Sequence, residues 1–286
     1  TLFRSMSQFA GRWGAWLFGI GAIFPIVFSV GYALLYSVGW AGVLADGFTF
    51  VHWANVWTKN EVLPSVLFSA YVSTTCTVFS WILAASFFVH LHRKWLQSNW
   101  GMVWYLPFAL PAMVAGFFTF QIFSGGGWLA RLAYHFGWIT SPQAFPEWVQ
   151  DPYGIGIVMA HLLTGVPFFL LFFRTLWKDA IVDAYSELSI ALGASISQTR
   201  WRVQLPILFQ RSKGNVLLYF LTVFGAYDIP LMVGSQSPQM ISVLTLRKFE
   251  RFDLADKPEA FIMALLYTAI LCAILLIKNV VDENPE

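Results

Sequence analysis

Long apolar runs separated by short polar segments make up most of the chain. A helix needs about 20 apolar residues to cross the hydrocarbon core of a bilayer. Six segments reach this length: 13–38, 62–90, 101–123, 153–177, 214–234 and 259–281. All six are predicted to be helices, because strands with open edges would leave backbone groups unpaired in lipid. The pattern therefore predicts an all-α integral membrane protein with six transmembrane helices in a single domain, residues 1–286.

The composition agrees with a membrane location. Of all residues, 58% are hydrophobic and 11% are charged, whereas a soluble domain carries about 25% charged residues. The net charge of +2 gives no reason to expect nucleic acid as a partner. Cys76 and Cys272 both lie in apolar runs, so neither a disulfide framework nor a metal-ligand spacing is present in the sequence. We therefore expect membrane lipid, and neither nucleic acid nor a bound metal, around this chain.

The basic residues predict the orientation of the helices. With the N-terminus in the cytoplasm, most of the 17 lysines and arginines fall in inner segments, as the positive-inside rule requires. The first apolar run follows Arg4 and Arg12, as it would in a signal peptide. At 13–38, however, it exceeds an h-region of about 7–15 residues, so we interpret it as a retained span. Both termini are predicted to be cytoplasmic.

Three loops then face the outside, near 39–61, 124–152 and 235–258. The first two are rich in tryptophan, and the third has apolar residues near helical spacing. Tryptophan is enriched at membrane interfaces, so interfacial packing is one interpretation. A docking surface for a soluble partner is the other, and the sequence leaves both open.

The segment 184–206, between the fourth and fifth expected spans, has a different pattern. Asp183 can satisfy free N–H groups at a helix start, and Leu188 and Leu192 follow at helical spacing. Gly193 stands where a helix C-terminus can use a positive φ, and Pro206 restricts how the chain enters the next span. Two short helices meeting at a glycine are predicted on the cytoplasmic side. Such a protrusion is shaped to fit a groove in another protein.

The spacing in this segment resembles the cytoplasmic signature of binding-protein-dependent ABC importer permeases. That signature is Glu-Ala-Ala, three residues, Gly, nine residues, Ile, any residue, Leu-Pro. Glu187, Gly193, Leu205 and Pro206 stand at the matching positions, and the stretch 194–202 provides the nine-residue spacer. The position between the fourth and fifth of six spans also fits the family.

Three positions depart from the signature. Leu188 and Ser189 replace the two alanines, and Val203 replaces the isoleucine. An ordinary amphipathic helix lying on lipid headgroups is the alternative interpretation of the segment. The four spaced matches favour the resemblance, which length and topology extend to most of the chain.

The resemblance implies a coupling helix that sits in a cleft of a cytoplasmic ATPase subunit. The residues that it assigns to ATPase coupling are Glu187, Leu188, Gly193, Ala194, Leu205 and Pro206. It further implies two ATP-binding subunits, a second permease subunit, and a periplasmic or extracellular solute-binding protein. The sequence leaves open whether the second permease is another copy of this chain, although the spermidine/putrescine resemblance described below favours a different chain. The implied location is the bacterial inner membrane. The chain itself would hold no cofactor, since ATP and Mg would bind the partner ATPase subunits.

The sequence contains no nucleotide-binding or catalytic motif. A G-x-x-x-x-G-K-[ST] loop is absent, and so are HExxH and a convincing Ser-His-Asp arrangement. We therefore expect a transport subunit and not an enzyme. The alternatives are an ATP-independent secondary transporter or channel, a membrane-embedded enzyme, and a scaffold that anchors an ATPase without moving solute.

Four residues are candidates for a substrate path: Gln121, His161, Tyr227 and Asp228. Ionisable groups inside spans are costly and tend to face a cavity or a partner, and Pro230 can loosen the helix beside Asp228. A cavity with these groups suits a cationic or hydrogen-bonding solute. The alternative is that Asp228 pairs with a basic group or lies near headgroups, while His161 contacts a neighbouring helix.

Two further stretches, FGAYDIPLMVG and DLADKPEAF, look like permeases of the spermidine/putrescine subgroup. That resemblance implies a small solute, either a polyamine or another cation. The subgroup is also similar to iron and phosphonate uptake systems. Because a separate binding protein sets most of the selectivity in such importers, the substrate stays open at this stage.

Overall fold

The structure is a computed structural model that describes residues 2–43, 47–96, 106–178 and 181–283. Within these ranges every regular element is a helix, as the sequence predicts. The described chain falls into two compact units, Thr1–Leu63 with Leu244–Glu286, and Pro64–Val243. Each unit is considered by itself. The single permease domain expected over 1–286 stays a prediction.

The first unit contains α1 (Leu2–Ser37), α2 (Val51–Thr58), the end of α12 (Ile241–Glu250) and α13 (Asp256–Glu283). Aromatic rings join α1 to α13: Phe261 lies 4.6 Å from Tyr36 and 6.0 Å from Tyr32, measured between ring centroids. Such ring pairs add to the stabilisation that comes from burial of apolar area.

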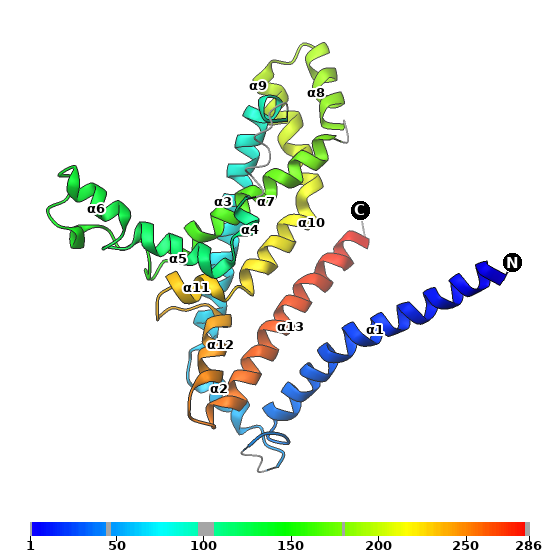
Figure 1. Cartoon of the computed structure of the whole chain (residues 1–286), viewed down its shortest axis with the longest axis vertical. Helices are drawn as coiled ribbons and strands as arrows, with labels where there is room; N and C mark the ends of the chain where they lie inside the picture. Colours follow the sequence, from blue (N-terminus) through cyan, green and yellow to red (C-terminus); the bar gives the residue numbers. More distant parts are fainter. Residues whose placement is uncertain (1, 44–46, 97–105, 179–180, 284–286) are drawn as a thin grey trace. The chain divides into compact units, whose positions relative to one another are not determined.

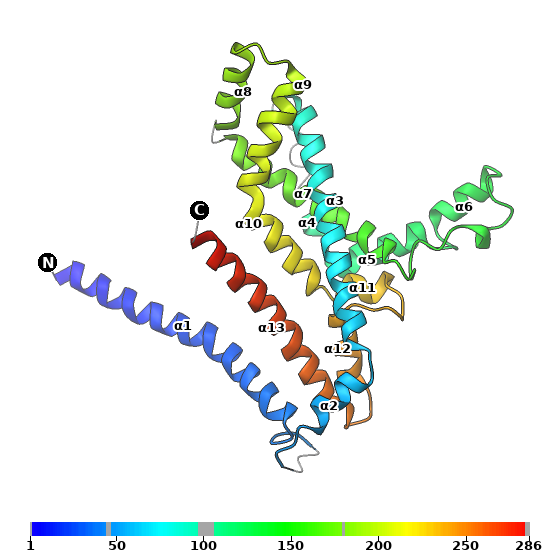
Figure 2. The same ribbon diagram turned by 180° about the vertical axis from the view of Figure 1, so that it is seen from behind.

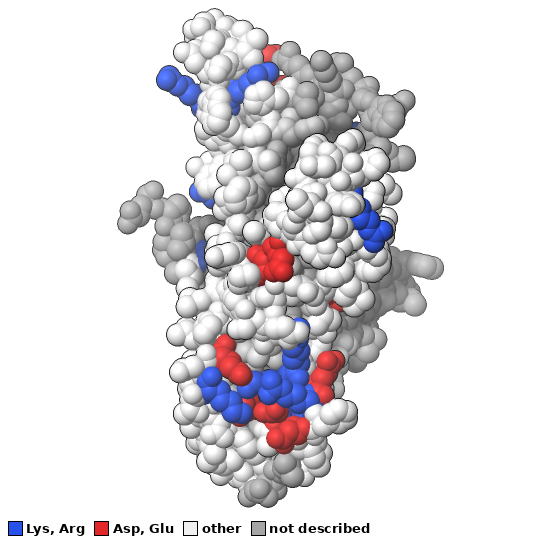
Figure 3. All heavy atoms as spheres, turned by 90° about the vertical axis from the view of Figure 1, so that its left-hand side faces the viewer, with Lys and Arg blue, Asp and Glu red and all other residues white. Residues whose placement is uncertain are grey.

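Charged side chains of both signs gather in one patch of the first unit (Figure 3). We call this group the ion-pair cluster; its members are Lys59, Glu61, Lys248, Arg251, Asp256 and Glu259. The ammonium of Lys248 lies 2.8 Å from a carboxylate oxygen of Glu61 and 2.8 Å from one of Glu259, and its side chain is only 1% exposed. Lys59 approaches the other oxygen of Glu259 to 2.6 Å. One carboxylate therefore serves two lysines.

The second unit contains eleven further elements, of which α3 begins at the end of the first unit, and the start of α12. They are α3 (Val62–Leu96), α4 (Leu106–Ala109), α5 (Ala112–Phe123), α6 (Trp128–His135), η2 (Pro142–Ala144), α7 (Ile155–Lys178), α8 (Ile181–Ala191), α9 (Ile196–Thr199), η3 (Arg200–Gln204), α10 (Leu205–Phe224) and α11 (Asp228–Val233). The core lies where α3, α7 and α10 meet, with Phe88, Phe173 and Leu208 fully buried.

The buried face of α3 carries hydroxyl groups that its own backbone satisfies. Ser69, Ser73 and Thr77 each donate a hydrogen bond to the carbonyl four residues earlier. The oxygen of Ser69 also accepts a hydrogen bond from the backbone N–H of Ile241, at 2.8 Å. Small polar residues at such spacing let apolar helices pack closely without leaving polar groups unpaired.

Five segments of the described chain are long and apolar enough to cross a membrane. They are Phe18–Ser37, Val62–His90, Ala112–His135, Ile155–Trp177 and Asp256–Lys278. Four of them correspond to the expected spans at 13–38, 62–90, 153–177 and 259–281. The all-helical membrane fold is thereby confirmed.

Two expected spans differ from continuous helices. In 101–123, the first five residues lie outside the described ranges, and the rest divides into α4 and α5 because Pro111 adopts an extended backbone, with φ −57° and ψ 145°. The expected span 214–234 breaks between Phe224 and Asp228, where α10 ends and α11 begins. Pro230 cannot donate a backbone hydrogen bond, so a continuous helix would be weakened at this position.

Candidate functional site

The sequence-predicted protrusion is a helical hairpin formed by α8, α9 and η3 and followed by α10 (Figure 1, and from behind in Figure 2). We call it the 181–206 hairpin. Helix α8 ends in a Schellman motif: the N–H of Gly193 donates to the carbonyl of Ile190 at 2.9 Å, and that of Ala194 to the carbonyl of Ser189 at 3.0 Å. Gly193 has the predicted positive φ, +90°.

The conformation of Gly193, and not its surroundings, requires glycine. A Cβ atom added there would meet no atom within 4 Å. A φ of +90° lies in the region that residues with a side chain rarely adopt. The glycine therefore sets the direction in which the chain leaves α8.

The second arm begins at a capping box. The Ser195 side chain accepts a hydrogen bond from the N–H of Gln198, and the Gln198 side chain accepts one from the N–H of Ser195. This reciprocal pair satisfies backbone donors that a helix start leaves free. Helix α9 consequently starts at a fixed residue just after the turn.

Helix α9 reaches α10 through η3, a single π-helical segment. The N–H of Leu205 donates to the carbonyl of Arg200, five residues earlier, instead of the usual four. Pro206, in the first turn of α10, has no N–H, and its ring would clash with the carbonyl four residues before it. The widened turn accommodates the proline without ending the helix, so Pro206 directs the entry into α10.

Four neutral side chains join the two arms of the hairpin. The hydroxyls of Ser189 and Thr199 lie 2.9 Å apart, and the amide nitrogen of Gln204 donates to the hydroxyl of Ser186 at 3.1 Å. Ser186 in turn donates to the carbonyl of Val182. We call Ser186, Ser189, Thr199 and Gln204 the polar lock. Three of the four, Ser186, Thr199 and Gln204, are buried.

The hairpin also exposes large apolar side chains. Leu192 is 80% exposed and Trp201 67% exposed, and Leu188 and Ile196 are also exposed. We call these four residues the exposed apolar face. Glu187 is exposed as well, and Ala194 is partly buried in the turn. Apolar groups of this size are unusual on a surface that meets only water.

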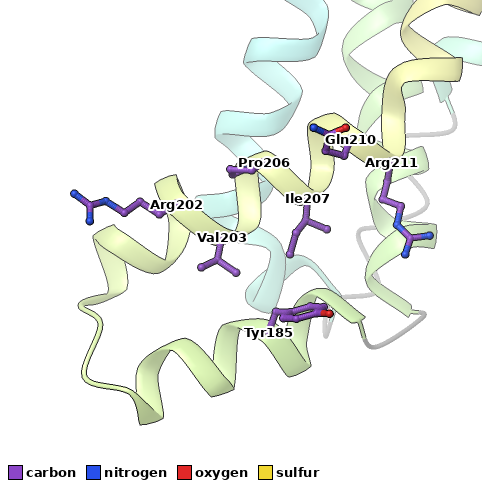
Figure 4. Close-up of a pocket in the computed structure, with 7 residues that line it drawn as sticks. All are labelled: Tyr185, Arg202, Val203, Pro206, Ile207, Gln210 and Arg211. Carbon is purple, nitrogen blue, oxygen red and sulfur yellow. The ribbon is translucent and has the colours of Figure 1, made fainter. Parts of the chain in front are cut away.

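A groove of about 410 Å³ runs between α8 and the start of α10 (Figure 4). Tyr185 approaches from α8, and Val203 and Ile207 face it from the other arm. Arg202 and Arg211 project at its two ends. Neither arginine has a carboxylate partner among the described residues. The groove combines an apolar floor with free positive charge.

The candidate substrate-path residues come from three helices of the second unit. Gln121 is exposed on α5, and Tyr227 and Asp228 are half-buried at the break before α11. Helices α5 and α11 pack together: a Cβ atom added at Gly116 would lie 3.2 Å from the Cβ of Met232. Asp228 stands in the first turn of α11, where the helix dipole favours a negative charge.

His161 lies apart from these residues, buried on α7 at 6% exposure. Its backbone carbonyl accepts a hydrogen bond from the Tyr219 hydroxyl at 2.8 Å, and its Nε2 atom is buried without a hydrogen-bond partner. The path role of all four residues stays a prediction. In the part of the chain that the structure describes, no group of three His, Cys, Asp or Glu residues could hold a metal ion.

The polar lock was not predicted from the sequence. Ser186 and Ser189 are spaced three residues apart, which places both on one face of α8. That spacing was the available signal, but it does not say which residues of the second arm they meet.

No family model matches the chain. Over 179 residues it is 27% identical to the sulfate transport system permease protein CysT of Synechocystis sp., a match that covers 62% of this chain and 58% of that protein. Over 154 residues it is 32% identical to the probable sulfate transport system permease protein cysT of Chlorokybus atmophyticus, covering 52% of this chain and 49% of that protein. The chain thus matches less than two thirds of the length of each of these relatives.

Among solved structures, the chain is similar to one in the crystal structure of a bacterial ABC transporter involved in the import of the acidic polysaccharide alginate. The TM-score is 0.66, the identity is 11%, and the match covers 97% of this chain and 95% of that chain. The two share a fold. The comparisons do not support the spermidine/putrescine subgroup, because the sequence relatives are named for sulfate.

Proposed function

We propose that this chain is the permease subunit of an ATP-driven ABC importer and that the 181–206 hairpin binds a cytoplasmic ATP-binding subunit. The observation that carries the proposal is the exposed apolar face on a hairpin that has Glu187, Gly193, Leu205 and Pro206 at the signature positions. The fold likeness to an ABC transporter chain and the sequence similarity to permease proteins support it.

The exposed apolar face favours a protein partner on energetic grounds. Full burial of a large apolar side chain contributes about 1.5–3 kcal/mol, and Leu188, Leu192, Ile196 and Trp201 all lie on the same hairpin. The arginines at the ends of the neighbouring groove, Arg202 and Arg211, would complement acidic residues of the partner. A cleft with an apolar floor and an acidic rim fits this surface.

The functions of an importer would be divided between this chain and partner subunits. ATP and Mg would bind two partner ATPase subunits, since the sequence contains no P-loop. A second permease subunit would complete the solute path, and a solute-binding protein would deliver the solute from outside. In this arrangement both termini and the 181–206 hairpin lie in the cytoplasm, and closure of the ATPase pair moves the spans through the hairpin.

For the substrate we propose an inorganic oxyanion, with sulfate as the first candidate. The sequence relatives are named for sulfate, and the structural neighbour belongs to a system that imports an acidic polysaccharide, so both solutes are anions. Gln121 and Tyr227 offer neutral hydrogen-bond donors that suit an oxyanion. Asp228 then serves the N-terminus of α11 and does not contact the solute, because a carboxylate would repel it.

The first experiment is to extract the chain in mild detergent and identify the co-purifying proteins by mass spectrometry. The complex is then reconstituted in vesicles, and uptake of radiolabelled sulfate is measured with and without ATP, with labelled spermidine as the comparison solute. We expect a P-loop ATPase to co-purify and sulfate uptake to require ATP.

Two results would contradict the proposal. One is an intact chain that purifies without any ATPase. The other is uptake that persists without ATP and follows an ion gradient, which would favour a secondary transporter. ATP-dependent uptake of spermidine but not of sulfate would refute the oxyanion substrate alone.

A further inference from the structure

We propose that Ser186, Ser189, Thr199 and Gln204, the polar lock, are positioning residues that make the two arms of the 181–206 hairpin move as one rigid lever. The inference rests on the proposed function, because a lever matters only if partner ATPase subunits act on it. It adds the residues on which transmission of force through this hairpin depends.

The hairpin needs a second connection between its arms. The turn from Leu192 to Ser195 links α8 to α9 at one end only, so a force applied to α8 alone could open the angle between the arms. The Ser189–Thr199 contact crosses ten residues of sequence, and the Gln204–Ser186 hydrogen bond crosses 18. Two cross-links at different distances from the turn block rotation that a single link would allow.

Most of the polar lock is buried, so water competes little for its hydrogen bonds. Ser186 and Thr199 are each 2% exposed, so their hydrogen bonds form in a low-dielectric environment. The exposed apolar face lies on other residues of the same hairpin, chiefly Leu192 and Trp201. The surface that would bind a partner and the contacts that join the arms are therefore separate, and one can be changed without the other.

Gln204 itself argues for a role beyond stability. Its amide nitrogen is bonded to Ser186, but its Oε1 atom is buried without a hydrogen-bond partner. An apolar side chain of similar size would avoid that unsatisfied acceptor. Polar groups retained in a dry contact at a stability cost can instead specify one arrangement of the helices.

The test is the number of sulfate ions taken up per ATP hydrolysed by the reconstituted complex. The double variant Ser189→Ala/Thr199→Val removes the hydroxyl contact with little change in volume. We expect the ratio to fall by about twofold to tenfold, because loss of a buried contact lowers the equilibrium constant of the joined arrangement by up to about tenfold. Ser86→Ala, which removes an exposed hydroxyl on α3 outside the hairpin, is the matched control and should keep the wild-type ratio.

A second variant separates transmission from folding. Because the two hydroxyls lie 2.9 Å apart, Ser189→Cys/Thr199→Cys can form a disulfide on oxidation. The background carries Cys272→Ser, since Cys272 is exposed and Cys76 is buried. We expect a low ratio in the reduced pair, recovery to at least half of the wild-type ratio after oxidation, and no recovery in either single-cysteine variant.

The outcomes are distinguishable. A wild-type complex that couples ATP hydrolysis to uptake of neither sulfate nor spermidine would refute the proposed function, and this inference with it. If spermidine alone is taken up, the same ratio is measured with spermidine. A coupled wild type together with a normal ratio in Ser189→Ala/Thr199→Val would refute the polar lock alone. The polar lock is likewise refuted if the oxidised pair, with its disulfide verified by mass spectrometry, stays uncoupled.

Discussion

Two polar clusters join segments of this chain, and they use opposite chemistry. The ion-pair cluster of the first unit buries the ammonium of Lys248 between Glu61 and Glu259. The polar lock of the second unit uses only hydroxyls and one amide. Removal of one member of a charged group leaves an uncompensated charge, whereas neutral partners can be replaced by apolar groups at little cost in stability. Substitutions in the charged cluster are therefore expected to cost much stability, whereas those in the neutral cluster are expected to cost little.

The largest effect is expected in the ion-pair cluster. Glu259→Leu should lower the free energy of unfolding by about 3–5 kcal/mol, because it removes the carboxylate that two lysines share and leaves Lys248 with Glu61. Unfolding in mixed micelles, followed by tryptophan fluorescence, measures the change. The control Glu250→Gln alters an exposed carboxylate on α12 and should stay within about 0.5 kcal/mol. A loss below about 1 kcal/mol for Glu259→Leu would mean that Lys248 is not held as described.

The next effect concerns the backbone of the hairpin. Gly193→Val should cost about 1–2 kcal/mol, because the variant must hold a positive φ, and ATP-dependent uptake should be lost. Since nothing lies within 4 Å of an added Cβ atom, Gly193→Asn should retain at least half of the uptake, as asparagine tolerates this conformation. Full uptake by the valine variant would contradict the docking role of the turn.

A smaller effect on stability is expected in the polar lock. Gln204→Leu should change the free energy of unfolding by less than about 1 kcal/mol, because it removes the unsatisfied Oε1 atom together with the hydrogen bond. Sulfate uptake per ATP should nevertheless fall. Gln143→Leu, at an exposed position in η2, is the control. A large loss of stability with an unchanged ratio of sulfate uptake to ATP hydrolysis would mean that the polar lock, like the ion-pair cluster, mainly stabilises the fold.

The smallest effect is on pH dependence. The hydrogen bond to Glu259 raises the pKa of Lys59 above its usual 10.5. The stabilisation from Lys59 is therefore complete below that pH and is lost as pH rises through the raised pKa. Lys59→Met should lower stability by at most about 1 kcal/mol at neutral pH, because the Lys59 side chain is 43% exposed. Unfolding measurements should show this difference vanishing at high alkaline pH, whereas the effect of Ser186→Ala should not vary with the ionisation of Lys59.

Local signals predicted the parts of the structure that depend on neighbours in sequence. Apolar runs located four of the five described segments that are long and apolar enough to cross a membrane, and Gly193 marked the end of α8 because a positive φ is a local property. The break near Asp228 was anticipated only as loosening by Pro230, since hydropathy does not distinguish a continuous helix from α10 followed by α11.

Contacts between residues far apart in the sequence could not be predicted from sequence patterns. Lys59 and Glu259 are 200 positions apart, and no periodicity relates them. The polar lock was missed because serine and threonine in helices usually bond to their own backbone. Asp228 was interpreted as a counter-charge for a cationic solute, but an acidic residue at the start of a helix is also a local stabilising feature. A single ionisable residue could not decide the substrate.

The π-helical turn ahead of Pro206 changes the direction in which side chains point before and after it. One additional residue in a helical turn rotates everything before it by about 100° relative to everything after it. The faces of α9 and α10 are therefore out of phase although the helices follow each other almost without interruption. One stripe of side chains can be matched to the bilayer and another, turned aside, to a soluble partner. A single inserted residue thus allows α9 and α10 to present two binding surfaces on different faces of one nearly continuous helix.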